Sequence, residues 1–216
     1  MTASSTKASN SLLDGVADIL RDVGPLSADP ALGSRASRDI CEKKRRKAWD
    51  NTTEARCNFE FRPRIVPRAG LWFLSLWQKS VMGRTLTEIK SDPAEVQHFA
   101  DAVSDFLVSV LGPTLSGGHW CVCTSPKRRH KERNFATLIC MEIHNRLKIP
   151  FYDDVALCHS RQRINAVFTL NVLPKEPNII VFDDFVTTGS TLKSMRNLLL
   201  PHSKNLLFVA GINNLL

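Results

Sequence analysis

The segment IIVFDDFVTTGSTL, residues 179–192, decides the fold class of this chain. Its first four residues are wholly apolar, which is typical of a short strand buried on both faces of a sheet. Two carboxylates, Asp183 and Asp184, come directly after these residues. A polar loop around Gly189 then leads into an expected helix over residues 191–200. The order of buried strand, polar loop and helix predicts a parallel α/β sheet.

Outward from this segment, helical and strand-like patterns alternate along the chain. Asp92 and Pro93 open a helix whose apolar stripe reaches Val110, since proline is favoured in the first turn of a helix. Further patterns predict a helix over residues 134–147 and strands at residues 119–123, 149–157, 167–172 and 205–212. Residues 90–216 are therefore predicted to form an α/β domain with parallel crossovers. Its sheet is expected to be doubly wound and mostly parallel.

Residues 1–89 are predicted to form an N-terminal extension or hood. Residues 1–10 are small and polar, and we expect them to be disordered. Apolar residues then recur with helical spacing over residues 11–23, so we expect the extension to be helical. The apolar run at residues 71–77 leaves three alternatives open, namely a strand, a short helix or the surface of a homodimer.

The charge of the chain is uneven. The formal net charge is +8, and residues 121–170 alone carry nine Lys and Arg against four Asp and Glu, a net of +5. Such a local excess indicates an anionic ligand at one place, while nucleic acid stays open as a partner. No stretch approaches the roughly 20 apolar residues of a membrane helix. The N-terminus lacks the basic-then-apolar order of a secretory signal, so we expect a cytoplasmic protein.

The residues after the buried strand have the composition of a phosphate site. In open α/β sheets, ligands bind at the carboxyl ends of the strands, which is where these residues fall. The loop supplies hydroxyl groups, a glycine that lets a ligand approach the backbone closely, and N–H groups at the start of a helix. Its residues are Thr187, Thr188, Gly189, Ser190 and Thr191. The two carboxylates would repel a phosphate unless they meet hydroxyls or a cation, and a ribose diol with Mg²⁺ meets both needs. A helix cap explains one such residue, but not both acids with the whole loop.

This segment resembles the phosphoribosyl-pyrophosphate motif of the type I phosphoribosyltransferases, in which a hydrophobic run, two acids and Thr-(Thr/Gly)-Gly-x-Thr follow one another. The resemblance implies that Asp183 and Asp184 contact the ribose hydroxyls as catalytic residues, with the metal held indirectly through ribose or water. It also implies that residues 187–191 cradle the 5′-phosphate. The implied activity is transfer of a phosphoribosyl group to a nitrogenous acceptor, with Mg²⁺ as cofactor.

A second loop is expected to bind the pyrophosphate group. In the family this loop follows an earlier strand and often carries a basic residue, and here residues 124–133 follow the predicted strand at 119–123. The candidates are Ser125, Lys127, Arg128 and Arg129. Basic side chains would offset the negative charges of the ligand. A solvated basic loop without a ligand is the alternative.

Within the family, the chain is most similar to the ComF-like competence proteins. Their run Arg-Glu-Arg-Gly-Phe-Asn resembles KERNFA at residues 131–136, and their Arg-x-Asn-x-x-Phe stretch resembles RINAVF at residues 163–168. That stretch belongs to a mobile loop, so the resemblance implies that Arg161 and Arg163 contact pyrophosphate on closure. The zinc-binding cysteine pairs of that subgroup are missing from residues 1–60. The six cysteines, among them Cys121 and Cys123, are expected to be small buried thiols.

Two functions follow from the sequence. The first is a phosphoribosyltransferase, whose acceptor the sequence does not identify because in the family the hood selects it. The alternative is a ComF-like binding or regulatory module without catalysis, which acts with DNA or a protein partner. It is favoured by the basic run Lys43, Lys44, Arg45, Arg46 and Lys47. A P-loop protein is disfavoured, because the chain has no Gly-x-x-x-x-Gly-Lys-Ser/Thr run.

Overall fold

The computed structural model describes residues 55–126, 134–159 and 167–214. Contacts between Cα atoms divide the chain into Met1–Lys44 and Arg45–Leu216, and every described residue belongs to the second unit. The predicted helix at residues 11–23 and the basic run at residues 43–47 therefore lie outside the described residues. Among the helices of the described part, none is long and apolar enough to cross a membrane.

The central sheet has six strands in the order β2-β3-β10-β9-β5-β6. These strands are β2 Arg64–Arg68, β3 Leu71–Gln78, β10 Asn205–Asn213, β9 Asn178–Val186, β5 Trp120–Thr124 and β6 Phe151–Tyr152. Within this sheet β2 runs antiparallel to β3, and the other pairings are parallel. The predicted α/β fold with a mostly parallel sheet is confirmed.

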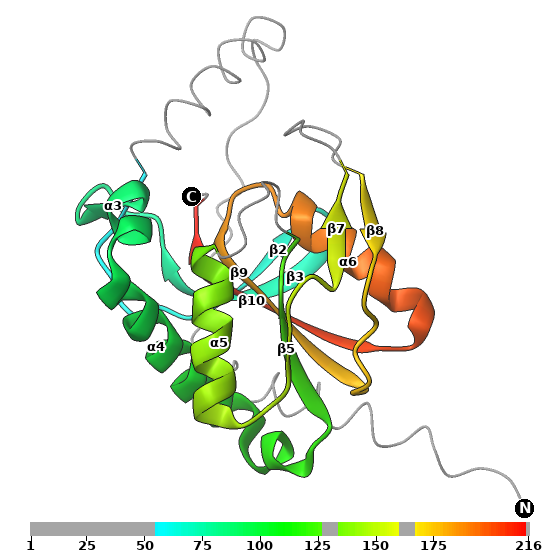
Figure 1. The fold of residues 1–216 in the computed structure, drawn as a ribbon. Helices are drawn as coiled ribbons and strands as arrows, with labels where there is room; N and C mark the ends of the chain where they lie inside the picture. Colours follow the sequence, from blue (N-terminus) through cyan, green and yellow to red (C-terminus); the bar gives the residue numbers. More distant parts are fainter. Residues whose placement is uncertain (1–54, 127–133, 160–166, 215–216) are drawn as a thin grey trace, which may run out of the picture. The chain divides into compact units, whose positions relative to one another are not determined.

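Helices cover both faces of the sheet, as Figure 1 shows. They are α3 Leu86–Ser91, α4 Pro93–Leu111, α5 Phe135–Leu147 and α6 Ser190–Leu199, with short 3₁₀ helices at Gly112–Gly117 and Leu200–His202. On one face, α4 and α5 pack against each other and bury Phe99 and Ile139. On the other face, α6 buries Leu192 and Met195. The sheet is therefore doubly wound, as predicted.

Strand β3 resolves the open segment at residues 71–77 as a strand. It lies between β2 and β10, so its apolar side chains serve both cores: Phe73 lies on the α6 side and Trp77 on the α4 side. A strand buried on both faces has no polar alternation, and its pattern cannot be told from that of a short buried helix. Both β2 and β3 precede residue 90, so the sheet uses residues on both sides of the expected domain boundary.

Two short antiparallel pairs lie beside the central sheet. One joins β1 Arg56–Cys57 to β4 Arg84–Thr85, and the other joins β7 Ala156–Cys158 to β8 Phe168–Leu170. The expected parallel crossovers are therefore wrong for β7 and β8, which pair with each other as an antiparallel ladder. Strands of three residues satisfy their backbone groups most simply with the neighbouring segment of the chain.

The two cysteines of β5 are buried thiols. Cys121 and Cys123 are both inaccessible to solvent. Burial raises the pKa of Cys123 to about 12. A thiol with a raised pKa forms little thiolate at neutral pH, so these side chains act as small core residues.

Caps fix the junction between α3 and α4. At the start of α3, Thr85 Oγ1 accepts from the Glu88 N–H (3.2 Å) and Glu88 Oε2 accepts from the Thr85 N–H (2.7 Å), which is a capping box. At the start of α4, Asp92 Oδ1 accepts from the Ala94 N–H (3.0 Å). Arg84 Nη1 lies 2.9 Å from Asp92 Oδ2. These contacts place the end of α3, which borders the cleft described below.

Asp92→Asn is expected to lower the free energy of unfolding at neutral pH but not in acid. The N–H of Ala94 and the guanidinium of Arg84 hold the pKa of Asp92 below its ordinary value. Such a group stabilises the fold above its unfolded-state pKa of about 4, and this stabilisation is lost as the pH falls through the lower folded-state value. Asparagine caps a helix as well as aspartate does, so the substitution removes mainly the charge. Urea unfolding at neutral pH and below about pH 3 measures the effect, and an equal difference at both would contradict it.

Candidate functional site

Strand β9 carries both predicted acids. It continues through Asp183 and Asp184 to Val186, because its last residues still pair with β10. The expectation that the strand ends before Asp183 is therefore corrected. Consecutive residues of a strand point to opposite faces of the sheet. Each carboxylate consequently has its own set of contacts.

Asp183 faces the loop that follows β5. The Ser125 hydroxyl donates to Asp183 Oδ1 (2.9 Å), and the Ser125 N–H donates to the Phe182 carbonyl (2.9 Å). Ser125 is almost completely buried, with 8% of its surface exposed. The serine thus ties the loop to the acid, with its hydroxyl hydrogen directed at the carboxylate.

Asp184 faces α3. Lys90 Nζ lies 2.7 Å from Asp184 Oδ2 and 4.5 Å from the centre of the Phe185 ring. The Phe185 N–H donates to Asp184 Oδ1 (2.9 Å). The Asp184 side chain is 13% exposed and that of Lys90 is 46% exposed. The ammonium group therefore neutralises a largely buried carboxylate while its solvent side stays open to a ligand.

Residues 187–191, which we call the hydroxyl loop, comprise the three residues between β9 and α6 and the first two residues of α6. Gly189 has a φ of 73°, in the left-handed region that glycine adopts without a steric penalty. Helix α6 begins at Ser190, and Gly189 offers no side chain to cap it. The Thr188 hydroxyl donates to Ser190 Oγ (3.0 Å). Hydroxyl groups thus gather at a helix start, whose N–H groups and macrodipole favour an anion.

The hydroxyl loop is anchored from behind by two other strands of the sheet. Arg68, at the end of β2, donates from Nη1 to the Thr187 carbonyl (2.8 Å). Beyond the end of β10, Asn214 Nδ2 donates to Thr187 Oγ1 (3.2 Å), and the Asn214 N–H donates to the Val186 carbonyl (2.9 Å). The position of the loop is therefore fixed by contacts from β2 and from the end of β10.

These elements surround one cleft of about 620 Å³. Small-molecule sites in proteins have volumes of about 300–1,000 Å³. The sequence-predicted residues that line the cleft are Ser125, Asp183, Asp184, Thr187, Thr188, Gly189 and Thr191. The opposite walls come from the α3–α4 junction, with Lys90, Pro93 and Val96, and from the start of α5, with Phe135. The lining of the cleft therefore combines polar, hydroxyl-rich residues with apolar ones.

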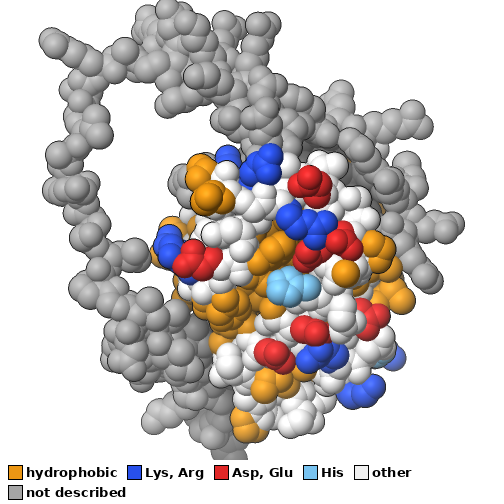
Figure 2. Space-filling view, turned by 90° about the vertical axis from the view of Figure 1, so that its left-hand side faces the viewer, with side chains coloured by type: hydrophobic (Ala, Val, Ile, Leu, Met, Phe, Trp, Pro, Cys, Tyr) orange, Lys and Arg blue, Asp and Glu red, His pale blue; other side chains and the backbone are white. Residues whose placement is uncertain are grey.

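The outer face that carries α3 and α4 has no single charge sign. Figure 2 shows acidic and basic side chains interleaved on this face, with apolar side chains between them. On this face, the described residues thus offer no continuous basic patch of the kind that binds nucleic acid.

Several predicted site residues lie outside the described part of the chain. They are Lys127, Arg128 and Arg129 of the second loop, and Arg161 and Arg163. Pro126 and Asn134, which flank residues 127–133, both line the cleft. The described chain thus enters and leaves this basic segment at the edge of the cleft. Ser190 is described, at the first position of α6.

Three residues at the site were missed from the sequence: Lys90, Arg68 and Asn214. Lys90 had a usable signal, because the Thr85-x-x-Glu88 pattern predicts a helix that places Lys90 in its last turn. Arg68 and Asn214 had none, because their contacts with Thr187 join segments that are remote in the sequence.

No family model matches the chain, and no curated protein matches it. Solved structures of phosphoribosyltransferases do match. An adenine phosphoribosyltransferase is 16% identical, with 72% of this chain and 86% of that chain covered and a TM-score of 0.45. The adenine phosphoribosyltransferase of Saccharomyces cerevisiae is 15% identical, with 76% and 89% covered and a TM-score of 0.43. The orotate phosphoribosyltransferase of Aeropyrum pernix is 13% identical, with 74% and 75% covered and a TM-score of 0.38. At these identities and TM-scores, the matches carry no conclusion about the function of this chain.

Proposed function

We propose that this chain binds phosphoribosyl pyrophosphate with Mg²⁺ and transfers the phosphoribosyl group to a nitrogenous acceptor. One observation carries the proposal: a single cleft brings the acid pair together with the hydroxyl loop and the start of α6. Carboxylates accept hydrogen bonds from sugar hydroxyls, whereas a helix start with hydroxyl side chains takes a phosphate. The two kinds of group are therefore complementary to the two halves of a ribose phosphate.

In this assignment, Asp183 and Asp184 hold the ribose hydroxyls and the hydroxyl loop holds the 5′-phosphate. Ser125 keeps one oxygen of Asp183 oriented, and Lys90 neutralises Asp184 until the ligand arrives. A ribose bound by both acids is fixed in place while its anomeric carbon is attacked. Positioning of this kind lowers the barrier because the ligand has already lost its freedom of rotation.

Mg²⁺ fits the oxygen donors of this cleft. Among the described residues, no group of three or more His, Cys, Asp or Glu side chains is arranged to hold a metal by itself. Mg²⁺ does not require such a cage, because it is usually bound by one or two carboxylates with water and substrate phosphates. Asp183 and Asp184 would hold it through ribose or water. When bound, the ion supplies positive charge to the leaving pyrophosphate.

The pyrophosphate end is assigned to Lys127, Arg128 and Arg129, with Ser125 at the start of the same loop. This assignment is supported by the cleft-lining positions of Pro126 and Asn134, on either side of the basic segment. Arg161 and Arg163 are assigned to a loop that closes over the same group, on the resemblance stated above. In the reaction, the bond from the anomeric carbon to pyrophosphate oxygen breaks and a bond from the acceptor nitrogen forms. Basic side chains favour this step by stabilising the charge of the departing pyrophosphate.

A rise in melting temperature with ligand tests the binding claim. Millimolar phosphoribosyl pyrophosphate with Mg²⁺ is expected to raise the melting temperature of the protein, because a ligand that binds only the folded state stabilises it by mass action. Glucose 6-phosphate with Mg²⁺ serves as the control for any sugar phosphate. An unchanged melting curve with phosphoribosyl pyrophosphate, or an equal rise with the control, would sink the proposal.

Pyrophosphate release separates a transferase from a binding module. The protein is incubated with phosphoribosyl pyrophosphate, Mg²⁺ and a panel of purine, pyrimidine and other nitrogenous bases. Release that depends on one base identifies a transferase and its acceptor class. A thermal shift without release for any base supports the non-catalytic binding module instead.

A further inference from the structure

Arg68 makes an unusual set of contacts behind the hydroxyl loop. It is the last residue of β2, directly before the turn at Ala69 and Gly70. From Nη1 it donates to the Thr187 carbonyl (2.8 Å) and to Asn213 Oδ1 (2.8 Å), and it lies 3.4 Å from the Val186 carbonyl. One guanidinium nitrogen therefore joins the last residue of β9, the first residue of the loop and the end of β10.

The stem of Arg68 also supports the loop by packing. A Cβ atom placed on Gly189 would lie 3.3 Å from Arg68 Cγ and 3.5 Å from Ala69 Cβ. The glycine therefore faces the arginine stem and the following turn, with room for little more than a Cβ atom between them. The guanidinium fixes the start of the loop by hydrogen bonds, and the stem fixes its middle by contact.

The charge of Arg68 is not neutralised within the described part of the chain. Lys90 pairs with Asp184, whereas Arg68 forms no ion pair with any described carboxylate. Partial burial lowers the pKa of Arg68, yet an arginine side chain remains protonated at neutral pH. A positive charge thus lies against the hydroxyl loop, where it favours an anion bound by the same loop.

The side chain of Thr187 is oriented by the same support. Asn214 Nδ2 donates to Thr187 Oγ1 (3.2 Å), and Arg68 fixes the carbonyl of the same residue. A hydroxyl that accepts one hydrogen bond still has its own hydrogen to donate. In this arrangement Thr187 keeps that hydrogen for an acceptor in the cleft, as a phosphate oxygen would be.

We infer that Arg68 is a positioning residue that holds the hydroxyl loop ready for a phosphate monoester before any ligand binds. The identity of the ligand rests on the proposed function, whereas the order of the loop does not. A loop fixed in advance loses little conformational freedom on binding, so it binds more tightly than a loop that must be ordered by its ligand.

Binding of two separate ligands tests the inference. Arg68→Gln is expected to weaken binding of ribose 5-phosphate by about 10-fold to 100-fold, since displaced positioning groups typically cost this much. Arg68→Lys keeps the charge but not the planar fork, so it is expected to recover only part of the loss. Arg64→Gln, at the exposed first residue of the same strand, is the matched control and should bind like the wild type. Calorimetric titration with pyrophosphate, assigned to the other end of the cleft, should give the same affinity for all four proteins.

Hydrogen exchange of the ligand-free proteins separates this inference from the proposed function. Peptides covering residues 183–195 are expected to exchange faster in Arg68→Gln than in the wild type and in Arg64→Gln, while peptides from α4 exchange equally in all three. If the wild type binds no ribose 5-phosphate but this exchange difference is found, the proposed ligand fails and the positioning role stands. Equal exchange across residues 183–195 would overturn the positioning role, as would full recovery of affinity by Arg68→Lys.

Discussion

A double variant with Asp183→Asn and Asp184→Asn is expected to lose the thermal shift with phosphoribosyl pyrophosphate and Mg²⁺, and to lose about 100-fold or more of any pyrophosphate release. Asparagine has nearly the same shape as aspartate but carries no charge. Without the negative charge it holds a hydrated Mg²⁺ more weakly, and its amide nitrogen donates where the ribose hydroxyls also donate. The substitution therefore removes the chemistry of the acid pair and leaves the volume of the cleft unchanged.

The fold of the double variant is not expected to fail, because both side chains line the cleft and belong to neither hydrophobic core. Asp105→Asn is the matched control, since this acid lies on the outer side of α4 with 77% of its side chain exposed. The control should show the same thermal shift and the same pyrophosphate release as the wild type. If the double variant kept the thermal shift, Asp183 and Asp184 would not be needed to bind the ligand, and their assignment to the site would be wrong.

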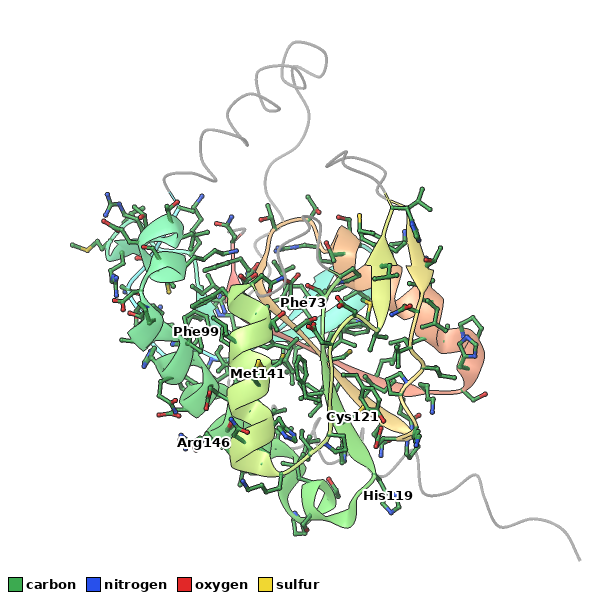
Figure 3. The ribbon with its side chains drawn as sticks, in the orientation of Figure 1. Phe73, Phe99, His119, Cys121, Met141 and Arg146 are labelled. Atoms are coloured by element: carbon green, nitrogen blue, oxygen red, sulfur yellow. The ribbon has the colours of Figure 1, made fainter. Side chains whose placement is uncertain are left out.

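Phe99→Ala is expected to lower the free energy of unfolding by about 3–5 kcal/mol, the usual loss when a buried phenylalanine is truncated. Phe99 points from α4 toward the sheet, as Figure 3 shows, and is fully buried. Its ring lies 4.7 Å from that of Trp77 and 5.2 Å from that of Phe135, centre to centre. A Cβ atom on Gly211 would lie 2.5 Å from Phe99 Cε1, so the ring also rests on the backbone of β10. One side chain thus connects α4 to α5 and to two strands.

Urea unfolding measures this loss, with Val108→Ala as the control. Val108 belongs to the same helix but is 50% exposed, so its truncation should cost well under about 1 kcal/mol. If both variants lost the same free energy of unfolding, the packing of the Phe99 ring would contribute no more to stability than an exposed side chain does.

The polar half of the site could be predicted from the sequence because it is local. Asp183, Asp184 and residues 187–191 are nearly consecutive, and one strand, one bend and one helix start place them all. Their chemistry follows from composition and order alone. Arg68 is 119 residues from Thr187 in the sequence, and their contact depends on the order of the strands in the sheet. No local pattern contains that order.

The fold was predictable to a similar extent. Helices α4 and α5 follow their apolar stripes and their caps at Asp92 and Asn134, and β10 follows its apolar run. Strand β3 stayed ambiguous because both of its faces are covered. The pairing of β7 with β8 was missed, because strand polarity is decided by partner choice and not by hydrophobicity.

The parallel pairing of β3 with β10 has a consequence for how the protein is made. Gln78 and Asn213, which pair across these strands, are 135 residues apart in the sequence, and Arg68 of β2 is 145 residues from Asn213. A nascent chain therefore carries the apolar segment of β3 without one of its two neighbours until the segment of β10 has been made. Contacts of such high sequence separation form slowly, and unpaired apolar strands are prone to aggregation in the meantime. Because the support of the hydroxyl loop needs the same late contact, ligand binding should become possible only when β10 has been added. Ligand binding would then report that the sheet is complete.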